Sequence, residues 1–412
     1  MKIRSITCFL NPNEARFEHQ LSQAQRLVES CKREFDQLAW ETQTARLATT
    51  PFGAYCHPHN ALATITHLEK QASQHAFDYI SIGHARITQP QEYELIPRIL
   101  AETEKVFCSA SMSHHHRGIS SAAVKACAGI ITAAARILPD GFANLRFCAT
   151  SHVRPFTPFF PASYSYGSQP AFALAMQCAD AAVRAFENAS SVAEGVRDLL
   201  AELENAAREL APIARQAEHE HGFAFKGFDF SLAPFPEDWC SLGGAFEKLG
   251  VPSIGYMGSL TAAAILADAL DRGDWKRAGY NGLMLPVLED SILAERTQGG
   301  HFTIKDLLLY SAVCGTGLDT VPLPGDTSAE MIEALLMDIS ALSLRLNKPL
   351  TARLMPVPGL KSGDMTAFDF GFFRNGQIMD FPAEALRNVL KSSEWLEVRK
   401  RVARFETCDP DE

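Results

Sequence analysis

The sequence of 412 residues has no block of basic residues, and its 48 Asp and Glu outnumber its 38 Lys and Arg, which gives a formal net charge of −10. Because nucleic-acid binding depends on clustered Lys and Arg, this balance disfavours a nucleic-acid groove. No segment approaches the roughly 18 to 20 consecutive apolar residues of a membrane-spanning helix. The first apolar run is short and reaches Pro12, so it predicts a first β-strand and not a signal peptide. We therefore expect a cytoplasmic protein with no nucleic-acid or membrane partner.

The ten cysteines form no C-x-x-C pair and are scattered through segments with strand and helix patterns. Dense disulfide frameworks are typical of short secreted chains with closely patterned cysteines. We therefore expect reduced and mostly buried thiols.

The composition, with 47% hydrophobic and 21% charged residues, is typical of a globular protein. The length suits one large α/β domain or two ordinary ones. No internal repeat or low-complexity linker is visible. We therefore expect one large domain covering residues 1–412, with a weak internal boundary near residues 150–170.

Strand and helix patterns alternate along the first 150 residues, and this rhythm predicts an α/β arrangement with parallel strands. The predicted strands there are 3–10, 40–49, 79–83, 106–110 and 145–150, and the predicted helices are 14–38, 60 onward, 90–104 and 120–137. Further helices are predicted at 169–188, 191–221, 239–249, 259–272 and 329–346. Further strands are predicted at 228–236, 282–288 and 348–354.

Two segments interrupt this pattern. Residues 113–118, S-H-H-H-R-G, contain three adjacent histidines, which cannot all face one metal ion from a regular element, so a polar loop is the favoured interpretation. Residues 152–167 interleave aromatic residues with prolines, and proline lacks the N–H that a central strand needs. This second segment predicts either a pocket wall or a buried aromatic crossover.

The stretch at 311–328, S-A-V-C-G-T-G-L-D-T-V-P-L-P-G-D-T-S, combines a cysteine with glycines, prolines and two aspartates. Glycine permits positive φ and a close approach of the backbone to a ligand, whereas proline stiffens the chain. The composition predicts a rigid loop that holds Cys314, Asp319 and Asp326 in an internal site.

Several motifs resemble one family. The run C-G-T-G-L-D-T-V-P-L-P-G-D-T-S at 314–328 is similar to its C-S-V-G-L-D-M-I-A-I-P-G-D-T-P signature, and four further stretches match as well. These are I-R-S-I-T at 3–7, D-F-S-L-A-P-F-P at 229–236, G-L-M-L-P-V-L-E-D at 282–290 and L-T-A-R-L-M-P-V-P-G at 350–359. The chain thus resembles domain-of-unknown-function family 711, which is related to uncharacterised protein family 210, over nearly its whole length.

The resemblance implies a fold like that of the glycyl-radical enzymes typified by pyruvate formate-lyase. In that α/β fold a large barrel of about ten strands surrounds a central finger loop, and Cys314 would lie on this loop. Glycyl-radical enzymes store the radical on a glycine in a C-terminal R-V-x-G-Y-type motif. Here the tail reads R-V-A-R-F at 401–405, with Arg404 where the glycine is needed. We therefore expect no glycyl radical.

Cys314 is the leading candidate for thiol chemistry. Its thiol precedes Gly315, Thr316 and Gly317, whose N–H groups could lower a thiol pKa or bind an oxyanion or substrate. A nucleophilic cysteine also needs a base within hydrogen-bond reach, and His152 is the candidate, with His114 as a second. The alternative is that Cys314 is an inert core residue.

Six carboxylates fall at or just beyond predicted strand ends, where ligands usually bind in parallel α/β folds. Asp319 and Asp229 are candidates for acid and base roles with separated pKa values. A second hypothesis is a hard divalent cation such as Mg²⁺ or Ca²⁺, held by Asp326, Glu289 and Asp290. The alternative is that most are helix N-caps or turn residues. The full set is Asp229, Glu289, Asp290, Asp319, Asp326 and Asp364.

Arg353 lies in an apolar predicted strand and must be paired if it is buried. A salt bridge with one of the aspartates is the favoured interpretation, and binding of an anionic substrate is the alternative. Lys348 and Ser231 are further candidates for substrate binding.

These patterns predict a non-radical enzyme that acts on a small polar or anionic metabolite by acid/base or thiol chemistry, with a divalent cation as a candidate cofactor. The alternative is a metabolite-binding or regulatory protein without turnover, in line with the ACT-type ligand-sensing partners associated with the related family. We also expect a homodimer.

Overall fold

The computed structural model describes residues 1–314, 316–391 and 394–401. Nine strands form one sheet in the order β10-β11-β7-β4-β3-β2-β1-β8-β9. The strands are β1 (Lys2–Leu10), β2 (Thr42–Thr49), β3 (Tyr79–Ala85), β4 (Val106–Ser111), β7 (Phe147–Ser151), β8 (Ala171–Gln177), β9 (Ala224–Asp229), β10 (Gly317–Pro324) and β11 (Leu350–Val357).

The sheet is mostly parallel. Strands β1, β2, β3, β4 and β7 run in one direction. Strand β8 is antiparallel to β1, and β9 is parallel to β8. At the other end β11 is antiparallel to β7, and β10 is parallel to β11. The predicted parallel α/β arrangement is therefore confirmed in this coarse form.

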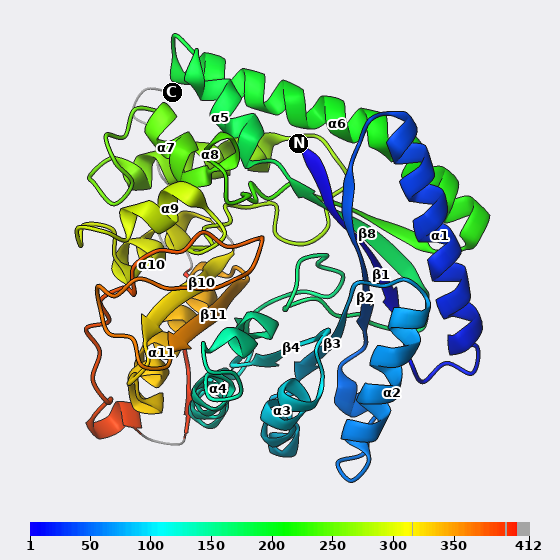
Figure 1. The fold of residues 1–412 in the computed structure, drawn as a ribbon, viewed down its shortest axis with the longest axis horizontal. Coiled ribbons are helices and arrows are strands. Elements are labelled where there is room, and N and C mark those ends of the chain that lie inside the picture. The colour runs from blue at the N-terminus through cyan, green and yellow to red at the C-terminus, as the bar shows by residue number, and fades with distance from the viewer. Residues whose placement is uncertain (315, 392–393, 402–412) are drawn as a thin grey trace.

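The helices cover the outside of the sheet, and Figure 1 shows α1 to α4 and α11 around the outer side of the strands. The longer helices are α1 (Phe17–Gln37), α2 (Ala61–Gln74), α3 (Pro90–Glu102), α4 (Ser121–Ala134), α6 (Val192–His221), α8 (Ser259–Arg272), α10 (Ile304–Val313) and α11 (Ala329–Leu346). The shorter ones are α5 (Ala179–Glu187), α7 (Leu242–Lys248) and α9 (Ser291–Arg296). A small second sheet joins β5 (Ser113–His114), β6 (Gly118–Ser120) and β12 (Trp395–Leu396).

The two faces of each strand have different environments because successive side chains point to opposite faces. In β2, Ala45 and Leu47 belong to the hydrophobic core shared with the helices, whereas Arg46 lines a cavity. In β11, Ala352 belongs to the same core and Arg353 lines the same cavity. The face that turns away from the helices therefore carries the polar side chains.

The segment 282–287 lies between the two end strands of the sheet. Leu232, just after β9, forms a parallel bridge with Leu283, and Pro286 forms one with Asp319 of β10. The Leu232 amide donates to the Gly282 carbonyl at 2.9 Å, and the Val287 amide donates to the Asp319 carbonyl at 3.0 Å. The predicted strand at 282–288 is thus present only as isolated bridges.

The predicted helix at 169–188 is wrong in its first half, which forms strand β8. Every residue of β8 is buried, so the segment A-F-A-L-A-M-Q has none of the polar alternation that marks a half-exposed strand. Its alanines favour a helix, and only the pairing with β1 decides the strand. Helix α5 then begins at Ala179.

The predicted loop at 311–328 is also wrong for most of its length. Residues up to Val313 complete α10, and Gly317–Pro324 form strand β10. Pro322 and Pro324 are tolerated because β10 pairs with only one named strand, β11, and proline is confined to such sheet-end positions. Cys314 is the C-cap residue of α10, and Gly315 lies outside the described residues.

The segment 152–167 contains no strand, as its prolines predict. It lies against the polar face of the sheet, where the Pro158 carbonyl accepts a hydrogen bond from Thr7 Oγ1 at 3.0 Å and the Ser163 carbonyl accepts one from Ser81 Oγ at 2.6 Å. Phe159 and Phe160 line the cavity, which agrees with the pocket-wall interpretation.

Within the described residues no helix is long and apolar enough to cross a membrane.

Candidate functional site

A cavity of about 570 Å³ lies on the polar face of the nine-stranded sheet. Side chains from strands far apart in the sequence line it, together with the aromatic segment that follows β7. Its polar and charged lining includes Arg4, Thr44, Arg46, Cys148, Tyr280, Glu289, Thr316, Asp319, Thr351 and Arg353. The sheet therefore brings together residues from both ends of the chain.

Arg353 binds two carboxylates of the cavity lining, those of Glu289 and Asp319. Its Nη2 donates to Oε1 of Glu289 at 2.7 Å, and its Nε donates to Oδ1 of Asp319. Arg4 approaches Glu289 from the other side, with Nη2 at 2.8 Å from Oε2. The favoured interpretation of Arg353, a salt bridge with an aspartate, is what the structure contains.

Arg46 also lines the cavity, and it has no carboxylate partner among the described residues. Its Nε donates to Thr44 Oγ1 at 3.0 Å, and the group lies 5.2 Å from the centre of the Phe160 ring and 6.0 Å from that of Tyr79. Burial, together with the charge of Arg4, lowers the pKa of Arg46 to about 9. Its positive charge is therefore poorly compensated.

The terminal nitrogens of Arg46 face the cavity. Neither Nη1 nor Nη2 donates a hydrogen bond to a described residue, and neither atom is fully buried. The residue as a whole is only 9% exposed. The two terminal nitrogens can therefore donate hydrogen bonds to an acceptor within the cavity.

The two carboxylate oxygens of Asp319 have different side-chain partners. Oδ1 is engaged by Arg353, while Oδ2 accepts no side-chain hydrogen bond from a described residue, and the side chain is 26% exposed. Burial raises the pKa of Asp319, and the nearby charge of Arg353 opposes that rise. A carboxylate whose pKa is raised holds a proton more readily than an ordinary aspartate does.

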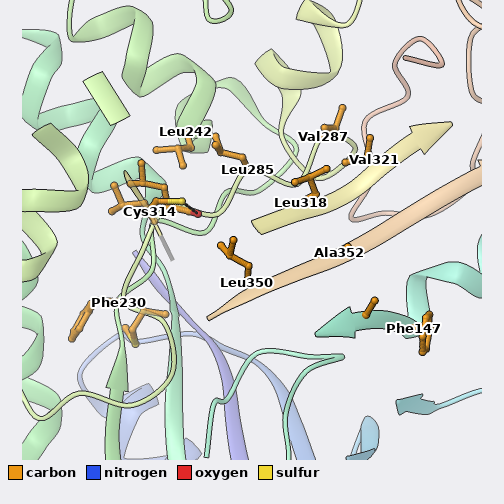
Figure 2. Close-up of a cluster of buried hydrophobic side chains, with 14 of the residues drawn as sticks. Phe147, Phe230, Leu242, Leu285, Val287, Cys314, Leu318, Val321, Leu350 and Ala352 are labelled. Carbon is orange, nitrogen blue, oxygen red and sulfur yellow. Dashed lines mark hydrogen bonds between the residues drawn. The ribbon is translucent and has the colours of Figure 1, made fainter. Parts of the chain in front are cut away.

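Cys314 lies outside the cavity lining. Its Sγ is 3.6 Å from the Leu283 carbonyl and 3.7 Å from Thr316 Oγ1. Figure 2 shows it within a cluster of buried hydrophobic side chains that includes Leu242 and Leu350. The setting is that of the alternative interpretation, a small core residue.

The two residues that follow Gly315 in the sequence have different roles. Thr316 lines the cavity, and its hydroxyl donates to the Leu283 carbonyl. Gly317 has a φ of +97°, and an added Cβ would lie 2.1 Å from the carbonyl oxygen of Thr351. Gly317 therefore permits the close contact of β10 with β11.

His152 does not line the cavity, and the structure places it beside another histidine. Its ring centroid is 6.2 Å from that of His115, within a group that also includes His114 and His116. Burial lowers the pKa of His152. His152 and Cys314 therefore lie among different groups of residues.

Asp229 and Ser231 stabilise a turn. The Asp229 carboxylate accepts hydrogen bonds from the amide and hydroxyl of Ser231, at 3.0 and 2.6 Å, and from the amides of Tyr280 and Asn281, at 2.7 and 2.9 Å. Lys348 donates from Nζ to the Ala312 carbonyl at the end of α10. All three residues have local structural partners.

The three proposed metal ligands point to different partners. Asp290 caps α9 and accepts from Ser241 Oγ and from backbone amides on both sides, whereas Glu289 is bound by two guanidinium groups. Asp326 is exposed, and Asp364, also exposed, accepts from the Lys361 amide. In the described part of the chain no three His, Cys, Asp or Glu side chains are placed to hold a metal ion.

The sequence-based candidates do not include Arg4 and Arg46, although the sequence pattern around each of them indicates a polar position in a strand. Each is a charged residue inside an apolar strand pattern, as Arg353 is. The tetrapeptide T-A-R-L also occurs twice, at 44–47 and 351–354, and both copies place Thr and Arg on the cavity. An arginine alternating with buried apolar residues marks the polar face of a strand.

Fold and cavity together define an α/β protein with a charged cavity over a nine-stranded, mostly parallel sheet. Residues 1–375 match the family model described as "Uncharacterised ACR (DUF711)", and the chain belongs to this family.

Its relatives include proteins named UPF0210. One from Pyrobaculum arsenaticum is 30% identical over 371 residues, which cover 84% of this chain and 80% of the relative. One from Oleidesulfovibrio alaskensis is 27% identical over 381 residues, with 87% and 83% covered. One from Clostridium perfringens is 27% identical over 344 residues, with 78% and 76% covered. The family resemblance read from the motifs is confirmed.

Proposed function

We propose that this protein is an enzyme that binds a small anionic metabolite in the cavity and transfers a proton to or from it. The observation that carries this proposal is Arg46, a buried guanidinium whose two terminal nitrogens open into the cavity without a carboxylate partner among the described residues. A buried cation without a partner is unfavourable, and an anionic ligand would compensate it. A planar guanidinium also matches the two oxygens of a carboxylate.

Asp319 is the proposed acid/base residue. In the forward step a proton moves from the bound substrate to Oδ2 of Asp319, and the electron pair stays on the substrate, where Arg46 stabilises the added negative charge. The same proton then returns to the substrate at its original or a neighbouring atom, so no further reactant is consumed. The raised pKa supports this role because it makes the Asp319 carboxylate a stronger base than an ordinary aspartate.

Proton transfer is favoured here over thiol chemistry and over a divalent cation. Cys148 is the cysteine that lines the cavity among the described residues, and burial raises the pKa of its thiol well above the usual value, which disfavours the thiolate. Glu289 and Asp319 are paired with guanidinium groups, and Arg46 adds an uncompensated positive charge. That donor set repels Mg²⁺ and Ca²⁺ more than it attracts them.

A library of small organic anions, assayed by thermal shift, tests the binding step, since a ligand stabilises the folded state according to its occupancy. A stabilising anion is then incubated with the protein in D₂O, and uptake of deuterium into a C–H position is followed by mass spectrometry. We expect Arg46→Gln to lose the stabilisation, and Asp319→Asn to keep binding and lose the exchange. Arg277→Gln is the matched control, because Arg277 is a partly buried arginine bonded to backbone carbonyls outside the cavity.

A binding or regulatory protein without turnover is the second candidate. The observation in its favour is that Glu289 and Asp319 are both already paired with Arg353, which reduces their availability for catalysis. An anion that binds through Arg46 but shows no exchange in D₂O, with Asp319→Asn unchanged in affinity, would support this candidate. The ACT-type partner stays a prediction.

We further propose that the sheet closes into a barrel through the segment 282–287, as in the pyruvate formate-lyase-like fold that we expect from the family resemblance. The bridges of Leu283 and Pro286 to the two end strands support this closure. The homodimer also stays a prediction, which light scattering coupled to size-exclusion chromatography tests.

A further inference from the structure

We infer that the ligand of the cavity is an amphipathic monoanion, a small molecule with one carboxylate and an aromatic or other apolar body. This inference rests on the proposed function, in which the cavity binds an anion, and it adds the chemical class of that anion.

The charge balance of the cavity points to one negative charge on the ligand. Arg4 and Arg353 are engaged by Glu289, and Arg353 is also engaged by Asp319, which leaves the charge of Arg46 without a partner. A second negative charge on the ligand would lie near two carboxylates whose cations are already occupied. In a buried site, repulsion of that kind is screened far less than in water.

The two remaining charged residues of the lining do not alter this balance. Glu104 is exposed, and Arg146 donates to the carbonyls of Leu100 and Val106 at 2.5 and 3.3 Å. Their charges are of opposite sign, so the cavity as a whole keeps one positive charge in excess.

The walls around Arg46 are apolar and largely aromatic. Tyr79 and Phe160 lie against its guanidinium, and Phe107 is in edge or tilted contact with both rings, at centroid distances of 5.3 and 5.5 Å. The cavity lining also includes Leu145, Phe159, Met284, Phe370 and Phe372. A strongly hydrated ion would lose water here without replacement, whereas a ring or alkyl body would gain contact area.

The size of the cavity agrees with such a ligand. Its volume of about 570 Å³ lies within the range of roughly 300 to 1,000 Å³ of pockets that bind small organic molecules. This leaves room for a ring, a short chain and one carboxylate.

The test compares four probes on the full chain by titration calorimetry at neutral pH: hydrocinnamate, its neutral amide, acetate and adipate. We expect hydrocinnamate to bind about tenfold or more tightly than each of the other three, because only hydrocinnamate combines one charge with an apolar body. Arg46→Gln should bring the affinities for hydrocinnamate and its amide close together. Phe160→Leu should weaken hydrocinnamate several-fold without weakening acetate.

Arg277→Gln serves as the control and should leave all four affinities unchanged. Equal affinity of the wild-type protein for hydrocinnamate and its amide overturns the inference, and this comparison needs no variant. Tighter binding of adipate overturns the single charge, and tighter binding of acetate overturns the apolar body. Either result, if the binding is still lost in Arg46→Gln, leaves anion binding intact. If none of the anions binds, both this inference and anion binding as the proposed function fail.

Discussion

Residues of one chemical type have different roles in this protein, and their neighbours decide which. Arg4 and Arg353 share the Glu289 carboxylate, whereas Arg46 faces aromatic rings and the cavity. Asp290 is saturated by donors at a helix N-terminus, whereas Asp319 keeps an open oxygen. An arginine or an aspartate in a strand pattern therefore indicates a polar face but does not identify the functional residue.

Asp319 gives a pH dependence of anion binding. Its carboxyl is neutral below its raised pKa and charged above it, so a bound anion is repelled only at higher pH. We expect affinity to be highest at low pH and to fall, by a factor on the order of ten, as pH rises through that pKa, which lies above the usual value of about 4. Calorimetric titration with benzenesulfonate, whose own charge is constant in this range, measures the effect.

Asp319→Asn is the matching variant, since it keeps an acceptor for Arg353 and removes the charge. Its affinity for benzenesulfonate should be constant over the same pH range and equal to the low-pH value of the wild-type protein. A fall with pH that persists in this variant would assign the titration to another group.

Among the elements, strands β10 and β11 each have one face toward the cavity and the other toward the core. Both strands alternate, so that Asp319 and Arg353 face the cavity while Leu318 and Ala352 face the core. The glycines and prolines around Cys314 predict a loop, yet Gly317–Pro324 within that stretch form strand β10. Gly317 is needed for close strand contact, and the prolines lie in a strand at the end of the sheet order.

Gly317→Ala should destabilise the protein. The φ of +97° is strained for alanine, and its Cβ would meet the Thr351 carbonyl at 2.1 Å, so β10 would have to shift away from β11. We expect the free energy of unfolding to fall by about 2 kcal/mol or more, measured by denaturant titration.

Gly129→Ala is the matched control. Gly129 lies within α4, and an added Cβ would meet nothing within 4 Å. Alanine should therefore leave stability unchanged or raise it by up to about 1 kcal/mol. A Gly317→Ala protein as stable as this control would mean that β10 does not contact β11 as described.

At the scale of the whole molecule, the sheet order gathers the site. Arg4 and Arg353, almost 350 positions apart in the sequence, both contact Glu289. The segment 282–287 precedes Glu289 in the chain. It also bridges to Leu232, just after β9, and to Asp319 of β10, at the two ends of the sheet.

Hydrogen exchange tests whether this segment joins the two ends in solution. The amides of Leu232 and Val287 donate to carbonyls across the junction, at 2.9 and 3.0 Å, and we expect them to exchange as slowly as amides inside β1. Val389, which is 81% exposed, provides the fast reference within the described residues. Exchange of Leu232 and Val287 at the rate of Val389 would mean that the sheet is open at this junction.

The sequence by itself determined the alternating strands and helices, the family and the pairing of Arg353, because periodicity, motif spacing and the penalty for an unpaired buried charge are local properties. Long-range pairing decided the rest. The alanine-rich segment 171–177 is a strand because it lies against β1, and Cys314 is a core residue because α10 ends against Leu283. Arg4, Arg46 and Asp319 meet at one cavity because strands from distant parts of the chain occupy one sheet, and such pairing leaves no mark in any single stretch of sequence.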